Sequence, residues 1–239
     1  MIISIRIAVL SFVLLAYPAR GAEQAAPKPT SHTTRLIEGW TVHVDDRLLA
    51  GPDKALGERA VRLLSDRLFE IALIVPADKV RRLRQVPIWL DRTHGELKRA
   101  QYHPGVEWLK ENGYDPKLVK CVHIPDAAEF VSPRFQREQP WAVLHELAHA
   151  YHDQVLGFDD PRIMSAWRKF VAGGRYKSVM HMSGRMRPHY GLTDQKEFFA
   201  EMTETYFGMN DFFPFNSVEL HHEEPEIFAL LARIWGPLP

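Results

Sequence analysis

The chain has 239 residues, with 30 basic and 30 acidic side chains and a single cysteine, Cys121. This neutral balance excludes the strongly basic surface typical of nucleic-acid-binding proteins, so we expect no nucleic-acid partner. One cysteine cannot form an intramolecular disulfide, so the fold depends on its hydrophobic core and on any bound metal. We expect Cys121 itself to be a small buried side chain rather than a nucleophile.

The N-terminus predicts a secretory signal peptide over residues 1–21. Arg6 precedes the apolar run Ile7–Tyr17, and Ala19 and Gly21 place small residues at positions −3 and −1 of a cleavage site. Eleven apolar residues are short for a membrane-spanning helix, although an uncleaved anchor is the alternative. We therefore expect a secreted or periplasmic protein, without stable membrane insertion after cleavage. Its mature form would have 218 residues and a formal net charge of −2.

Residues 22–34 contain Pro27, Pro29, Ser31 and several alanines and predict a flexible leader. Residues 35–239 predict one α+β domain, with a small sheet and helices at 35–130 and a mainly helical part at 131–239. Alternating and helical periodicities place the elements of the first part. We expect strands at Trp40–Asp45, Val86–Leu90 and Val119–Ile124, and helices at Lys54–Ile74, Asp78–Gln85 and Val106–Asn112. Pro87 favours an edge position for the second of these strands.

The most informative motif is His-Glu-Leu-Ala-His at residues 145–149, within a predicted helix over Pro140–Leu156 that Gly157 ends. Positions i and i+4 share a helix face, so His145 and His149 can bind one metal ion. Glu146 lies beside the first ligand, where its carboxylate can act on a water at the metal. This is the arrangement of zinc metallopeptidases. The alternative is a core helix whose histidines bond to backbone carbonyls.

A zinc site of this kind needs a third protein ligand, and the predicted helix Asp194–Gly208 offers the best candidates. Glu197 and Glu201 lie one turn apart on one face of it. Glu197 is the preferred ligand, although Asp194-x-x-Glu197 also matches a capping box. Glu201 is the other possible ligand, or an outer acceptor that orients His145. We expect Glu204 to be solvated or to pair with another helix.

The two motifs together resemble the glutamate-zincins of the anthrax lethal factor type, in which two histidines and a glutamate hold zinc. The Glu-Phe-Phe-Ala-Glu run at 197–201 follows the first motif at the spacing found in that family. The resemblance makes Glu197 the third ligand, Glu201 a supporting residue and Tyr190 a helper of the transition state. It covers roughly residues 140–208. It implies a zincin-like domain with Zn²⁺ as cofactor and a peptide or protein as substrate.

A group of small secreted bacterial zincin-like proteins of unknown role is more similar still. The similarity lies in Pro140-Trp141 before the zinc motif and in Gly157-Phe158-Asp159-Asp160-Pro161 after it. This resemblance implies no particular substrate.

Other candidate ligands are weaker. His181 and His189, in or beside a predicted loop or hairpin at Gly173–Pro188, are alternatives to Glu197 as the third ligand, as are Asp159 and Asp160. His152 is better explained as a structural or rim residue. We expect the pair His221-His222 to be solvated.

The sequence thus predicts a secreted zinc metallopeptidase with Glu146 as general base and Tyr190 as hydrogen-bond donor to the oxyanion. Two alternatives remain open. One is a non-catalytic secreted domain that zinc merely stabilises. The other is a zinc hydrolase of a non-protein amide or ester.

Overall fold

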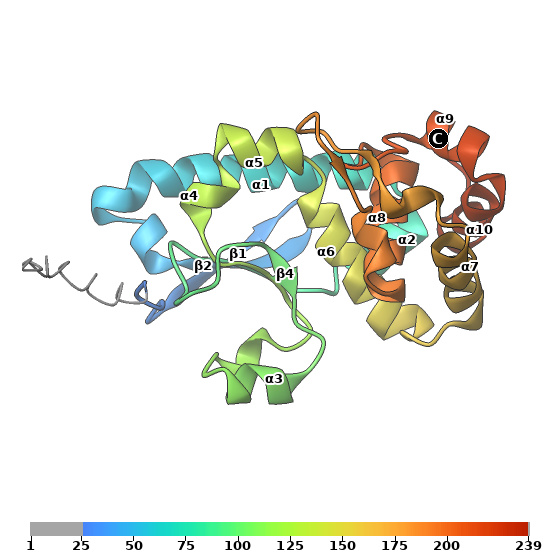
Figure 1. Ribbon diagram of the computed structural model, residues 1–239. Coiled ribbons are helices and arrows are strands. Elements are labelled where there is room, and N and C mark those ends of the chain that lie inside the picture. Colours follow the sequence, from blue (N-terminus) through green and yellow to red (C-terminus); the bar gives the residue numbers. More distant parts are fainter. Residues whose placement is uncertain (1–25, 239) are drawn as a thin grey trace, which may run out of the picture.

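A five-stranded mixed sheet forms the centre of the N-terminal half in the computed structural model, which describes residues 26–238 (Figure 1). The strands are β1 (His32–Ile37), β2 (Trp40–Asp45), β3 (Ile88–Leu90), β4 (Gln101–Tyr102) and β5 (Val122–Ile124). Their order is β1-β2-β3-β5-β4. The pairs β2–β3 and β3–β5 are parallel, whereas β1 and β4 pair antiparallel to their neighbours at the two edges. The predicted mixed α+β class is confirmed, and the predicted signal peptide lies outside the described residues.

The first strand corrects the predicted leader at residues 22–34. β1 begins at His32 and pairs with β2 over its whole length, from His32 opposite Asp45 to Ile37 opposite Trp40. Its polar sequence suits an edge strand whose residues are mostly exposed, and this polarity is why composition alone suggested a leader. Glu38 and Gly39 form the connecting turn with positive φ angles of 48° and 87°. Such angles are those that a tight two-residue hairpin loop requires.

The three predicted strands are all present, one with the predicted bounds and two with shorter ones. β2 has the predicted bounds, whereas β3 and β5 are shorter than expected. The predicted edge position of the strand after Pro87 is wrong, because β3 lies between β2 and β5. Pro87 precedes the strand, where its carbonyl accepts a hydrogen bond from the Val122 N–H, so no ladder donor is missing.

The two faces of the sheet pack against different helices. Alternate residues of β2, β3 and β5 enter the main hydrophobic core, on the side of helix α1 (Lys54–Ile74), which has the predicted bounds. The intervening residues face the side of α3 (Val106–Glu111), where Trp89, Leu109 and Cys121 form a smaller cluster. Figure 1 shows α1 and α3 on opposite faces. Cys121 is buried as expected, and burial raises the pKa of its thiol to about 11.

Helices make up most of the second half of the chain. Besides α1 and α3, the structure contains α2 (Ala77–Leu83), α4 (Ala127–Phe130), α5 (Pro133–Glu138), α6 (Ala142–Tyr151), α7 (Pro161–Ala172), α8 (Gln195–Phe207), α9 (Ser217–Glu223) and α10 (Pro225–Trp235). The helix predicted at residues 140–156 starts two residues later, and its last turn, His152–Leu156, is a π-helix. Gly157 follows with a φ of 84°, in its predicted position at the end.

Helices α6 and α8 pack side by side in the core (Figure 1). All residues of α8 from Phe198 to Phe207 are buried, including two threonines and two glutamates. Gly208 ends α8 directly against the indole of Trp141, which precedes α6. A Cβ atom on Gly208 would lie 2.1 Å from that ring, so only glycine permits this approach.

The predicted loop or hairpin at residues 173–188 is a two-stranded hairpin of β6 (Val179–Met180) and β7 (Met186–Arg187). Its methionines, Met180, Met182 and Met186, are exposed. Between residues 26 and 238, no helix combines the length and the apolar character needed to cross a membrane.

Candidate metal centre

Three side chains from α6 and α8 converge on one point. Oε2 of Glu197 lies 3.2 Å from Nε2 of His145 and 3.4 Å from Nε2 of His149. The two imidazole rings are 4.7 Å apart and nearly perpendicular. Two nitrogens and one carboxylate oxygen within this distance of one another are a donor set that can hold a divalent metal ion.

The start of α8 decides where Glu197 points. Asp194 caps the helix by accepting hydrogen bonds from the N–H groups of Lys196 and Glu197. The alternative predicted for Glu197, a capping box, would direct its carboxylate back to residue 194. Its carboxylate instead faces the two histidines. Burial alone would raise the pKa of Glu197, but hydrogen bonds from His145 and His149 lower it well below its ordinary value.

A carboxylate behind His145 orients this ring, and it belongs to Glu204 rather than to Glu201. Nδ1 of His145 lies 2.6 Å from Oε1 of Glu204 and 3.7 Å from Glu201. Of the two alternatives predicted for Glu204, solvation is wrong and pairing with another helix is confirmed, because the buried side chain on α8 bonds to His145 on α6. With Nδ1–H donating to Glu204, Nε2 of His145 is the nitrogen that can bind a metal, once the metal replaces the proton shared with Glu197.

Glu201 is buried beside two other acidic side chains, Asp211 and Glu204. Burial and the nearby charges of Asp211 and Glu204 raise its pKa well above the ordinary value. Its Oε2 atom has no hydrogen-bond partner among the described residues. The structure therefore places Glu201 beside the ligands, on the same face as Glu197, without a direct hydrogen bond to His145.

Glu146 is positioned by the edge strand β4. The N–H of Tyr102 donates to Oε2 of Glu146 over 2.7 Å. This N–H does not pair with β5, because the backbone groups of successive residues along a strand point to opposite sides. The neighbouring His103 pairs on the β5 side instead, where its N–H donates to the Cys121 carbonyl and its carbonyl accepts from the Lys120 N–H. Burial raises the pKa of Glu146, against the opposing effect of His145 and His149. A raised pKa suits a group that takes and returns a proton near neutrality.

The site opens into a cavity of about 490 Å³. Tyr190 lines this cavity from the short 3₁₀ helix Tyr190–Leu192 and is half exposed. Burial and the charge of Glu197 raise the pKa of its phenol, so its hydroxyl stays protonated and can donate a hydrogen bond. Arg187 of the hairpin, Arg99 and Arg134 also line the cavity, beside a larger number of acidic side chains.

The other candidate ligands are engaged elsewhere. His181 lies on the cavity wall, with Nε2 3.4 Å from Asp211, and Nδ1 of the buried His189 accepts from the Gly191 N–H. Asp160 caps α7 and binds Arg162. His152 is fully buried and packs on Phe158 and Phe199, which fits the structural role expected for it.

Sequence reasoning undervalued Glu204, although its periodicity could have identified it. Residues 197, 201 and 204 follow the i, i+4, i+7 spacing that places all three on one helix face. Asp211, which also lines the cavity, lies outside the helix and has no comparable local signal.

Replacing Glu204 by glutamine should weaken zinc binding about 10-fold, the lower end of the range for outer partners of a metal ligand. Glutamine keeps the acceptor oxygen but removes the charge that makes His145 more basic. Competition with a chromogenic chelator measures the affinity. The exposed Glu226→Gln is the matched control. Equal affinity in Glu204→Gln and in the wild type would contradict the assigned role.

The chain matched no protein-family model, no curated protein and no solved structure in comparisons with each.

Proposed function

We propose that this protein is a zinc-dependent metallopeptidase of the glutamate-zincin type. The observation that supports the proposal is the convergence of His145, His149 and Glu197, with Glu146 beside them. Two histidines and one glutamate form the ligand set of catalytic zinc sites, which keep the fourth position for water or substrate. Structural zinc sites usually have four protein ligands, so three ligands facing a cavity favour catalysis over a purely structural role.

Zinc bound to these three residues would supply a more acidic water and polarise the carbonyl of the substrate. The residues of the chain perform the proton transfers. Glu146, held by Tyr102 through one oxygen, takes the proton of the attacking water with the other and returns it to the leaving amine. Tyr190 keeps its proton and donates a hydrogen bond from its hydroxyl to the oxyanion as it forms.

Edge strand β4 is the proposed place for the substrate backbone. It has β5 on one side only, and its Tyr102 lies within hydrogen-bond distance of Glu146. An extended peptide that pairs with such an edge would bring a carbonyl group to the metal. A peptide or protein is therefore the substrate class that we propose. The signal peptide predicted at residues 1–21 suggests that the protein acts outside the cytoplasm.

The decisive test measures metal content and hydrolysis on the same preparation. Zinc-loaded protein should cleave members of a peptide library, and a chelator should abolish cleavage that added zinc restores. Bound zinc without cleavage of any peptide would refute the peptidase proposal. Release of product from simple amide or ester substrates alone would instead favour a zinc hydrolase of non-protein bonds.

Tyr190→Phe should lower kcat about 100-fold, as expected for loss of one oxyanion donor, with little change in KM or zinc content. The phenol touches the reacting atoms only as charge develops, so ground-state binding should be unaffected. Steady-state kinetics beside metal analysis separates these quantities. An unchanged kcat would remove Tyr190 from the mechanism.

A further inference from the structure

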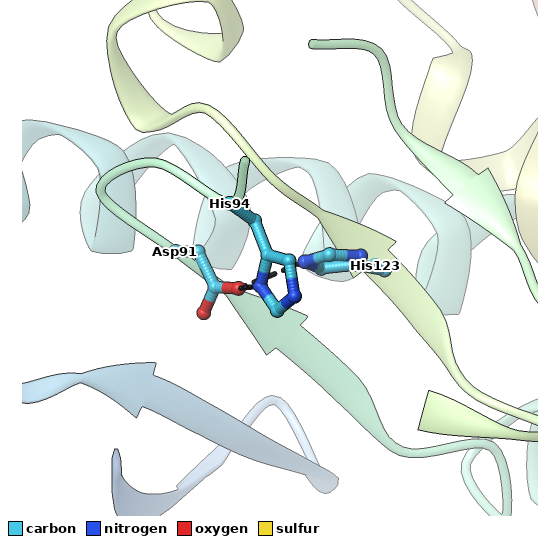
Figure 2. A group of neighbouring side chains, drawn as sticks. All are labelled: Asp91, His94 and His123. Carbon is cyan, nitrogen blue, oxygen red and sulfur yellow. Dashed lines mark hydrogen bonds and ion pairs between the residues drawn. The ribbon is translucent and has the colours of Figure 1, made fainter. Parts of the chain in front are cut away.

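A second group of potential metal ligands lies on the α3 face of the sheet. None of its members belongs to the first centre, the group of His145, His149 and Glu197. Asp91 follows β3, His94 lies in the loop after it, and His123 is the middle residue of β5 (Figure 2). One carboxylate oxygen of Asp91, Oδ2, lies 2.6 Å from Nδ1 of His94 and 2.8 Å from Nε2 of His123. The three side chains point toward one another from three separate segments.

The charge of Asp91 has no strong cationic partner. Its side chain is fully buried, and all its ion-pair partners among the described residues are histidines. No lysine or arginine is among these partners. A buried carboxylate without such a partner is costly unless another cation joins it.

The group also has the outer partners that metal ligands usually have. Nε2 of His32 lies 2.7 Å from the second oxygen of Asp91, Oδ1. Nε2 of His103 lies 3.2 Å from Nδ1 of His123, the ring nitrogen that faces away from Asp91. Such partners fix the orientation of a carboxylate and the tautomer of a histidine around a metal.

The backbone holds the group in place independently of these side chains. The Asp91 N–H donates to the carbonyl of Ile124, and the Asp91 carbonyl accepts from the Ala127 N–H, both over 2.9 Å. The carboxylate is therefore fixed relative to β5 and His123. His94 lies in the loop that leads to β4, where its carbonyl accepts a hydrogen bond from the Leu97 N–H.

We propose that Asp91, His94 and His123 form a second divalent-metal site, separate from the one on α6 and α8. Two imidazoles and a carboxylate suit Zn²⁺ and other divalent transition metals. The three residues are at most 4% exposed, so a substrate has no access and the role of the ion is structural. Bound there, it fastens the loop 91–100 to β5 and so supports the edge strand β4 that positions Glu146.

Zinc stoichiometry tests the proposal. The purified protein, stripped with a chelator and dialysed against a small excess of Zn²⁺, should hold two zinc ions per chain. His145→Ala with His149→Ala should hold one, and His94→Gln with His123→Gln should also hold one. The pair His221→Gln with His222→Gln, on the exposed surface of α9, is the matched control and should hold two.

The outcomes separate the two sites. One zinc in the wild type that disappears in the His145/His149 variant would overturn the second site and leave the first. One zinc that this variant retains and the His94/His123 variant loses would support the second site and refute the first. No zinc in any form would overturn both.

The test does not require the His94/His123 variant to fold. The zinc content of the wild type and of the His145/His149 variant alone shows whether a second site exists. In that variant, zinc should also raise the Tm, since an ion that binds only the folded state stabilises it. An unchanged Tm at saturating zinc would contradict a structural site.

Discussion

Glu146→Gln is expected to lower the turnover of peptide substrates by a factor of 10²–10⁴, the usual contribution of a general base, while zinc content is unchanged. Glutamine has the same shape and keeps an oxygen that can accept from the Tyr102 N–H. It cannot take a proton from water. Burial raises the pKa of the native carboxyl, so the substitution replaces a proton carrier with a group that does not titrate.

Steady-state kinetics and metal analysis of one preparation measure both quantities. Glu138→Gln makes the same chemical change elsewhere in the wall of the cavity, at the end of α5, and should leave turnover near the wild-type value. Full activity in Glu146→Gln would refute the assignment of the general base. Loss of zinc together with activity would show that Glu146 holds the metal rather than the proton.

His149→Ala and Glu197→Ala are each expected to abolish metal binding at the proposed site between α6 and α8. The three ligand atoms come from two helices, and each substitution leaves only two of them. The loss of affinity should exceed the 10–100-fold typical of outer partners. Glu201→Ala should keep this metal, because Glu197 is the carboxylate next to both Nε2 atoms.

Zinc per chain after dialysis measures the effect as the loss of one equivalent relative to the wild type. Glu201→Ala is the control for Glu197→Ala, since both remove a carboxylate from the same face of α8. The reverse result, with metal lost in Glu201→Ala and retained in Glu197→Ala, would exchange the two glutamates. Full retention in His149→Ala would remove that residue from the ligand set.

Local signals in the sequence predicted the helices that bear the ligands. Each of these signals depends only on residues of one helix. They are the apolar spacing along residues 54–74, the cap at Asp194 and the glycines that end helices at 157 and 208, and the structure has them where they were expected. Helical spacing places His145 and His149 on one face of α6, whereas their meeting with Glu197 depends on the packing of α6 against α8.

What the sequence could not predict depends on contacts between distant segments. The first three residues of β1, residues 32–34, were assigned to a leader because an exposed edge strand needs no apolar alternation. Glu204 was expected to be solvated or to pair with another helix, and only the packing of α6 on α8 decides between the two by burying it against His145. The group of Asp91, His94 and His123 spans 32 positions and arises from strand order, which no local pattern encodes.

The contact between Gly208 and Trp141 has a consequence for the metal selectivity of the proposed site at His145, His149 and Glu197. The ligand-bearing helices touch through a glycine that admits the indole, so packing of the core sets the distance between their ligand atoms. The entropic cost of bringing the ligand atoms together is then met when the chain folds, and it does not reduce the free energy of metal binding. A cleft of fixed width also favours ions whose radius matches it. Evolution could retune this preference by changing the residue at one helix end, without altering any ligand.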